Sequence, residues 1–196
     1  SGFVFSISGG NSSDVVLNST PTSIQINGDN TIFTLGLGIS GLPADGTELI
    51  TVNPVSDDSI FDISGNAATA SQSNNQIYLS DGLGPVITDV SGSLDNSNIY
   101  VTFNENIYSN DDGTGVLDIN DFNIVTSGIT YQLESVDTTN NVFTFTITPD
   151  SIANGTEYLT INPASNTSIY DFSGNAASTT QNNNTFYFYD ITLPTI

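Results

Sequence analysis

Ser59-Ile-Phe-Asp-Ile-Ser-Gly-Asn-Ala-Ala68 occurs a second time in this chain, as Ser168-Ile-Tyr-Asp-Phe-Ser-Gly-Asn-Ala-Ala177, with eight of ten positions identical. The match continues upstream at the same offset of 109 residues, so that Pro54 corresponds to Pro163. This period is too long for a solenoid repeat of roughly 20 to 50 residues and fits a complete small domain. The sequence therefore predicts two tandem copies of one domain.

The two copies differ in length. The second copy, residues 85–196, opens with a section at residues 86–107 that has no counterpart in the first copy. The first copy, residues 1–84, aligns only from about Phe3, which corresponds to Phe122. We therefore expect the first copy to be N-terminally incomplete. Its missing strands would either be lost, which leaves an exposed sheet edge, or be supplied by another chain or segment.

Both copies have the sequence pattern of β-strands. Apolar residues alternate with Thr, Tyr or Gln, as in Ile99, Val101 and Phe103, and no long run has the spacing of an amphipathic helix. About seven such segments fall in roughly 105 residues, the size of an immunoglobulin-like sandwich. The predicted fold is all-β: tandem immunoglobulin-like antiparallel β-sandwiches with about seven strands per repeat.

All charged side chains in the sequence are acidic. It has 21 acidic residues and no Lys, Arg or His, which gives a net charge of -21. Nucleic acids and anionic membranes are excluded as partners, because Lys and Arg supply most of the affinity for both. Buried carboxylates must be hydrogen-bonded, protonated or neutralised by a cation, since no basic side chain is present to pair with them.

The composition also argues against an enzyme. Without His, Cys and Lys the chain lacks the commonest general base, the thiolate nucleophile and the Schiff-base amine. A glycosidase would need two carboxylates at a fixed separation in a cleft, and nothing in the sequence identifies such a pair. Zinc and copper sites of His and Cys are excluded, whereas calcium, which takes oxygen ligands, fits the available side chains.

The chain resembles the bacterial immunoglobulin-like repeats of large surface and secreted proteins, including those of cyanobacterial swimming-motility proteins. The resemblance rests on the stretches Val101-Thr-Phe-Asn-Glu-Asn-Ile107, Gly155-Thr-Glu-Tyr-Leu-Thr160 and Asp171-Phe-Ser-Gly-Asn-Ala176. It implies an extracellular stalk or adhesive filament module at the cell surface, often with calcium at the domain junctions. The implied partners are neighbouring repeats of the same or an identical chain. The complete lack of basic residues departs from the usual pattern.

Asp62 and Asp171 hold corresponding positions before a Ser-Gly-Asn turn, where Gly and Asn tolerate positive φ. One interpretation is an Asx-type turn that fastens a long loop. The other is a calcium site at the domain joint, because the loops before the last strand and after the second strand of a sandwich emerge at the same end as the incoming linker. The candidate ligands are Asp81, Asp89, Glu105, Asp171 and Asn175, with a partial site at Asp62 and Asn66.

Two other acidic stretches are interpreted as solvated. Residues 111–115, Asp-Asp-Gly-Thr-Gly, only superficially resemble a calcium loop, since the terminal Glu and flanking helices of an EF-hand are absent. The pair at residues 57–58 has no acidic counterpart in the second repeat and is interpreted as surface charge.

A second function remains open. Tyr78, Tyr187 and Tyr189 lie near the last strand of each repeat and would form an aromatic platform if they shared a face. Cross-strand packing is the alternative explanation for them. The alternative function is accordingly a non-catalytic module that binds glycans or surfaces.

Overall fold

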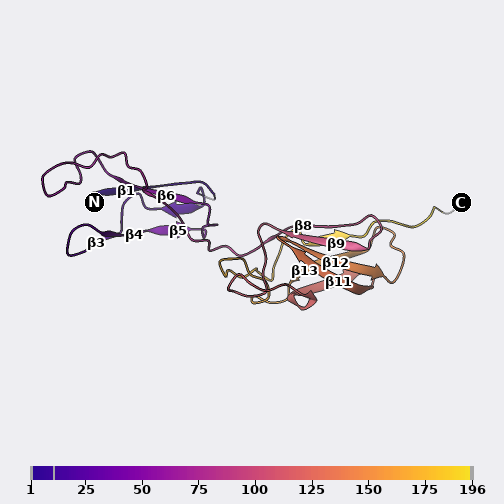
Figure 1. Cartoon of the computed structure of the whole chain (residues 1–196). Coiled ribbons are helices and arrows are strands. Elements are labelled where there is room, and N and C mark those ends of the chain that lie inside the picture. The colour runs from indigo at the N-terminus through magenta and orange to yellow at the C-terminus, as the bar shows by residue number, and fades with distance from the viewer. Residues whose placement is uncertain (1, 11, 195–196) are drawn as a thin grey trace. The chain divides into compact units, whose positions relative to one another are not determined.

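The computed structural model describes residues 2–10 and 12–194. Nearly all of its regular structure is β, in several antiparallel sheets, with one short 3-10 helix (Figure 1). The all-β prediction is confirmed. In the part of the chain described, no helix is long and apolar enough to cross a bilayer. Contacts divide the chain into a first unit, Ser1–Leu83, and a second unit, Gly84–Ile196.

The second unit has two antiparallel sheets. The three-stranded sheet has the order β10-β13-β14, and the four-stranded sheet has the order β11-β12-β9-β8. Its elements are β8 (Ile87–Gly92), β9 (Asn98–Phe103), the 3-10 helix η1 (Ile119–Asp121), β10 (Phe122–Ser127), β11 (Tyr131–Thr139), β12 (Val142–Pro149), β13 (Tyr158–Pro163) and β14 (Thr185–Tyr187).

The core of the second unit lies on the inward faces of these strands. Along β12, the alternation of Phe143, Phe145 and Ile147 with Thr buries all three apolar side chains. The Phe143 ring lies 4.4 Å from the Phe122 ring and 4.7 Å from the Phe145 ring, measured between centroids. Period-two alternation thus packs one face of the sheet against the core, as the sequence pattern predicts.

The first unit has shorter strands in three small sheets. β1, β6 and β7 form a sheet in the order β1-β6-β7, while β2 pairs with β5 and β3 pairs with β4. The bounds are β1 (Phe3–Ser8), β2 (Val15–Leu17), β3 (Ser23–Ile26), β4 (Phe33–Gly36), β5 (Ile39–Gly41), β6 (Leu49–Pro54) and β7 (Gln76–Tyr78).

One sheet occurs in both units. Phe3 pairs with Pro54 at the start of β1, and Phe122 pairs with Pro163 at the start of β10. Both ladders then run antiparallel for six residue pairs without a shift. The alignment of Phe3 with Phe122 is therefore confirmed by strand register.

The last strand of the second unit is shorter than the period-two pattern indicates. The sequence predicts a strand over residues 185–189, whereas β14 ends at Tyr187. Beyond it, the Asn96 side chain takes the place of a strand: its Nδ2 donates to the Tyr189 carbonyl at 2.9 Å, and its Oδ1 accepts from the Tyr189 N–H at 2.9 Å. Asn96 is fully buried, with a left-handed φ of 60°. This pairing joins the end of the unit to the β8–β9 turn.

Candidate functional site

Asp62 and Asp171 build the same turn in the two units. One Asp62 oxygen accepts from the Ser64 and Asn66 N–H groups, both at 2.8 Å, and the other accepts from the Asn66 side-chain amide at 2.8 Å. Asp171 accepts from the Asn175 N–H and side-chain amide, both at 2.7 Å. The hydrogen bonds that Asp62 accepts, above all from the Asn66 side chain, lower its pKa below 3.8. These are the geometries of Asx turns, which hold each loop closed.

The two turns differ in their exposure. Asp171 is fully buried, while Asp62 is exposed. In the second unit the segment after β9 lies against the turn: Tyr108 and Tyr170 exchange two backbone hydrogen bonds, at 2.8 and 2.9 Å. A Cβ added to Gly113 would lie 2.9 Å from the Phe172 carbonyl oxygen. In the first unit the residues of this turn, Asp62 to Asn66, are all exposed.

The second unit brings Glu105 and Asp171 together. A carboxylate oxygen of each lies within 4.8 Å of the other. Two unit charges at this distance repel by about 1 kcal/mol in water and about 3.5 kcal/mol at an effective dielectric constant of 20. A divalent cation bound between the two carboxylates would replace this repulsion with attraction, and oxygen pairs of this kind suit calcium.

The other predicted ligands are placed as follows. Asp89 stands at an exposed position of β8. Asp81 belongs to the first unit, where its carboxylate accepts from the Leu83 N–H at 2.9 Å. Gly84 begins the second unit against the Asp171 turn, since a Cβ on Gly84 would overlap the Ala176 carbonyl oxygen. The joint site as a whole stays a prediction.

The remaining acidic stretches form local hydrogen bonds. Asp112 accepts from the Thr114 N–H at 3.1 Å and from the Thr114 hydroxyl, which makes the 111–115 loop another Asx turn. Asp57 accepts from the Ala70 N–H at 2.5 Å and so fastens the 57–70 loop of the first unit. Neither stretch needs a metal ion to account for its shape.

A pair of buried acids was not predicted from the sequence. Glu48 is fully buried in the first unit, and Glu157, at the corresponding position, is 8% exposed in the second. The Glu48 carboxylate accepts from the Asp45 N–H at 3.0 and 3.3 Å, and the Glu157 carboxylate accepts from the Asn154 N–H at 2.9 Å. The sequence does carry a signal for this pair, because Gly-Thr-Glu recurs in both copies, but the recurrence does not indicate that the acid is buried.

Asp95 provides a pH-dependent test of the second unit. The hydroxyls of Ser93 and Ser97 donate to its carboxylate at 2.6 and 2.8 Å, and these bonds lower its pKa from 3.8 to about 2. Because the folded-state pKa is depressed, its contribution to stability is complete above the unfolded value of 3.8 and is lost as the pH falls through about 2. An NMR titration of the Asp95 carboxyl carbon should give a midpoint near 2.

The matched control for this titration is Ser93→Ala. The Asp95 midpoint should move up toward 3.8 in this variant, while that of Asp190, whose pKa is lowered mainly by the Thr192 hydroxyl, should stay unchanged. If the Asp95 midpoint did not move, the Ser93 hydroxyl would not be the main cause of the shift.

Comparisons with known proteins do not add to this picture. No protein-family model, curated protein or solved structure matches the chain.

Proposed function

We propose that the chain is a structural or adhesive stalk module of a large bacterial extracellular surface protein, made of tandem immunoglobulin-like β-sandwich repeats. The observation that carries the proposal is the duplicated scaffold. The same three-stranded sheet, buried Glu and Asp-containing turn occur in both units. Tandem copies of one domain suit an extended rod, in which length and stiffness are the useful properties.

The absence of the usual catalytic side chains from the sequence also supports the proposal. The chain offers no His, Cys, Lys or Arg for catalysis. A non-enzymatic role fits this composition best.

We also propose that calcium stiffens the module, bound by Glu105 and Asp171 with Asp81 of the linker as a further ligand. Two features support this part. Glu105 and Asp171 lie close together with no basic side chain in the chain to neutralise them. Only two residues separate Asp81 from Gly84, which packs on the Asp171 turn. The Cα atom of Asp81 must therefore lie within about 11 Å of the Cα atom of Gly84.

Thermal unfolding with calcium and with chelator tests this part. For a dissociation constant of about 0.1–1 mM, typical of extracellular calcium modules, 10 mM calcium should stabilise the second unit by about 1.4–2.7 kcal/mol. The midpoint should then rise by roughly 5–10 °C. Sodium at equal ionic strength should have no such effect.

Single substitutions separate the ligands from nonspecific charge screening. Glu105→Gln and Asp171→Asn should abolish the calcium shift, and Asp81→Asn should reduce it. The control is Asp112→Asn, in an exposed loop of the same unit, which should leave the shift intact. Equal shifts in all four variants would refute a site at Glu105 and Asp171 without contradicting the stalk function.

A glycan-binding role is the second candidate. Tyr158 and Tyr187 are a cross-strand pair on β13 and β14 with ring centroids 5.5 Å apart, and Tyr187 is 61% exposed. Exposed rings of this kind can stack on sugar rings. Specific, saturable binding on a glycan array that is lost in Tyr187→Ala would favour this function over a passive stalk.

A further inference from the structure

Asn154-Gly155-Thr156-Glu157 forms a closed turn immediately before β13. The Asn154 Oδ1 accepts from the Thr156 N–H at 3.1 Å and from the Thr156 hydroxyl at 2.7 Å. The Glu157 carboxylate accepts from the Asn154 N–H at 2.9 Å. In an Asx turn of this kind the first side chain folds over the peptide bond that follows it. The Asn154 side chain is therefore held beside the backbone nitrogen of Gly155.

An Asn that precedes a Gly can react with its own backbone. The Gly nitrogen attacks the side-chain carbonyl carbon of the Asn, and the products are ammonia and a cyclic succinimide. Any residue with a Cβ in place of the Gly crowds this attack. Gly155 also has a φ of 87°, a conformation that favours Gly. The turn thus presents an electrophile and an unhindered nucleophile next to each other.

The same turn supplies a group for each charge that the reaction develops. As the Gly155 nitrogen attacks, negative charge gathers on the Asn154 Oδ1, at which the Thr156 N–H and hydroxyl already point. Donors placed in advance at such an oxygen stabilise the transition state. The turn is in this respect a small oxyanion hole.

The Glu157 carboxylate is placed to accept a proton. The pKa of Glu157 is lowered below 4.5, mainly by the hydrogen bond from the Asn154 N–H, with smaller contributions from neighbouring N–H groups that include Gly155. The carboxylate is therefore ionised at neutral pH. It also lies next to the proton that the Gly155 nitrogen must lose, which is the position of a general base.

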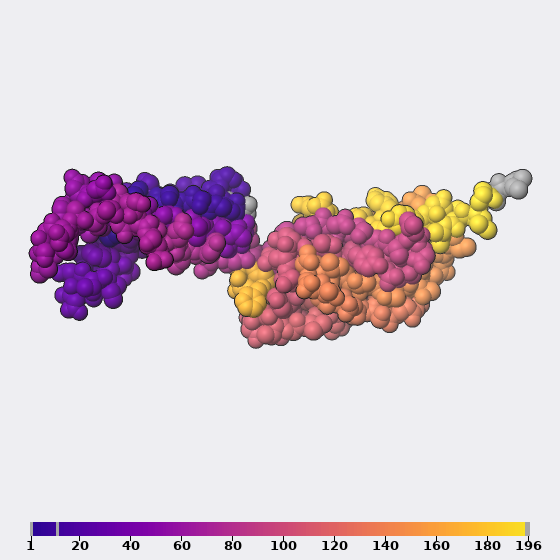
Figure 2. All heavy atoms as spheres, turned by 45° about the horizontal axis from the view of Figure 1, so that its top comes forward, coloured from indigo at the N-terminus to yellow at the C-terminus, as the bar shows by residue number. Residues whose placement is uncertain are grey.

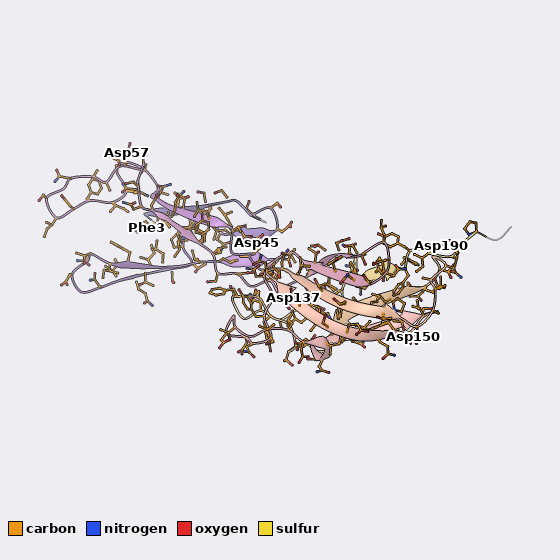
Figure 3. All side chains as sticks on the ribbon, turned by 45° about the vertical axis from the view of Figure 1, so that its right-hand side comes forward. Phe3, Asp45, Asp57, Asp137, Asp150 and Asp190 are labelled. Atoms are coloured by element: carbon orange, nitrogen blue, oxygen red, sulfur yellow. The ribbon has the colours of Figure 1, made fainter. Side chains whose placement is uncertain are left out.

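The surroundings hold the turn in place and leave it open to water. Asn154, Gly155 and Thr156 are exposed. A Cβ added to Gly155 would lie 3.4 Å from the Cβ of Asp190, which Figure 3 labels, and the Ile191 N–H donates to the Ala153 carbonyl at 3.1 Å. Figure 2 shows orange atoms, the colour of residues 150–160, at the surface beside the yellow C-terminal stretch.

We propose that Asn154 is converted to aspartate by self-catalysed deamidation within this turn. The Gly155 nitrogen forms a bond to the Asn154 Cγ and gives its proton to Glu157. The bond from Cγ to Nδ2 breaks, and the proton returns to the departing ammonia. Water then adds to Cγ, the bond from Cγ to the Gly155 nitrogen breaks, and aspartate remains. One water is consumed and one ammonia is released.

The first unit shows that the turn accommodates the product. Its corresponding stretch, residues 45–48, is Asp-Gly-Thr-Glu. The Asp45 Oδ1 accepts from the Thr47 N–H at 2.9 Å and from the Thr47 hydroxyl at 2.5 Å, and the Asp45 N–H donates to the Glu48 carboxylate at 3.0 and 3.3 Å. Deamidation of Asn154 would therefore give both units the same turn. The inference goes beyond the stalk proposal and does not depend on calcium.

The other Asn-Gly pair of the chain is a matched control. Asn27 precedes Gly28, but Asp29 and Asn30 stand where the second unit has Thr156 and Glu157. The Asn27 Oδ1 accepts from the N–H groups of residues 31 and 32, both at 2.9 Å. This pair lacks the hydroxyl donor and the glutamate of the Asn154 turn, so we expect no assistance to its deamidation.

The test follows deamidation in the whole folded chain near neutral pH, by mass spectrometry after digestion with a protease that cleaves at aromatic residues. Asn154 should react at least about tenfold faster than in a synthetic peptide of residues 150–160, because the peptide lacks the fixed donors and base. Asn27 should react no faster in the chain than in a peptide of residues 23–33. Equal or slower reaction of Asn154 in the chain would overturn the proposal.

The pH dependence tests the role of Glu157. In the chain the rate at Asn154 should stay nearly constant between about pH 6 and 8, because Glu157 remains ionised throughout. In the peptide, where hydroxide removes the proton, the rate should rise about tenfold per pH unit. Glu157→Gln should give the chain the rate and the pH dependence of the peptide. The same steep dependence in the unsubstituted chain would exclude Glu157 as the base and overturn the proposal.

Substitution of Thr156 keeps the test valid even if Glu157→Gln unfolds the second unit, since Thr156 is exposed. Thr156→Val removes the hydroxyl donor and should slow the reaction at Asn154 at least about tenfold. Thr156→Ser keeps the hydroxyl and should retain the rate. Circular dichroism would verify that both variants are folded. An unchanged rate in Thr156→Val would contradict the oxyanion hole and overturn the proposal.

Discussion

Phe143→Ala should lower the free energy of unfolding of the second unit by about 3–5 kcal/mol. The Phe143 ring is fully buried, and its centroid lies 4.4 Å from that of the Phe122 ring and 4.7 Å from that of the Phe145 ring. Its removal would leave a cavity and break two aromatic contacts. Because a domain of this kind is stable by only about 5–15 kcal/mol, urea denaturation followed by circular dichroism should show a large fall in the midpoint.

The first unit provides the matched control, Phe33→Ala. Phe33 corresponds to Phe143 but is 38% exposed, with Phe3 as its aromatic neighbour at 5.4 Å. The loss should be only about 1–2 kcal/mol, because Phe33 is partly exposed and less buried apolar area is lost with its ring. If the two substitutions cost the same, Phe33 would be packed as closely in solution as Phe143.

Much of the fold could be predicted because it depends on local pattern. Alternation along β9 and β12 identified the strands, and the 109-residue offset identified the duplicated sheet before its register was known. The approach of Glu105 to Asp171 also followed from a general rule, that alternate loops of a sandwich emerge at the same end. The immunoglobulin-like topology itself remains a proposal.

The environment of corresponding residues could not be predicted in the same way. Asp62 and Asp171 lie in nearly identical decapeptides, yet one is exposed and the other fully buried. The difference comes from residues 105–116, which pack on the second turn and are distant from it in sequence. Likewise, nothing in the turn Ser93-Leu-Asp-Asn-Ser97 indicates that Asn96 pairs with the backbone of Tyr189, 93 residues away. Long-range packing decides such cases, and local pattern carries no information about it.

Glu48→Ala should destabilise the first unit by about 3 kcal/mol. Glu48 is fully buried, and its carboxylate accepts from the Asp45 N–H with both oxygens, which closes the Asp45-Gly-Thr-Glu48 turn. Loss of a hydrogen bond to a charged acceptor costs about 1.5–3 kcal/mol, and the deleted methylene costs about 0.8 kcal/mol. Since the sequence has no Lys, Arg or His, no side-chain ion pair can offset the burial of this acid.

The conservative variant Glu48→Gln distinguishes this structural role from a need for charge. Gln keeps one acceptor oxygen and the methylenes, so it should cost about 1 kcal/mol and leave the turn closed. Urea denaturation gives the stability, and hydrogen exchange of the Asp45 amide reports the turn directly. If Gln were as damaging as Ala, the charge of Glu48 itself would be required, and an unidentified cation near the turn would become the better explanation. Recovery in Glu48→Gln would instead show that the hydrogen bonds of the side chain, and not its charge, stabilise the turn.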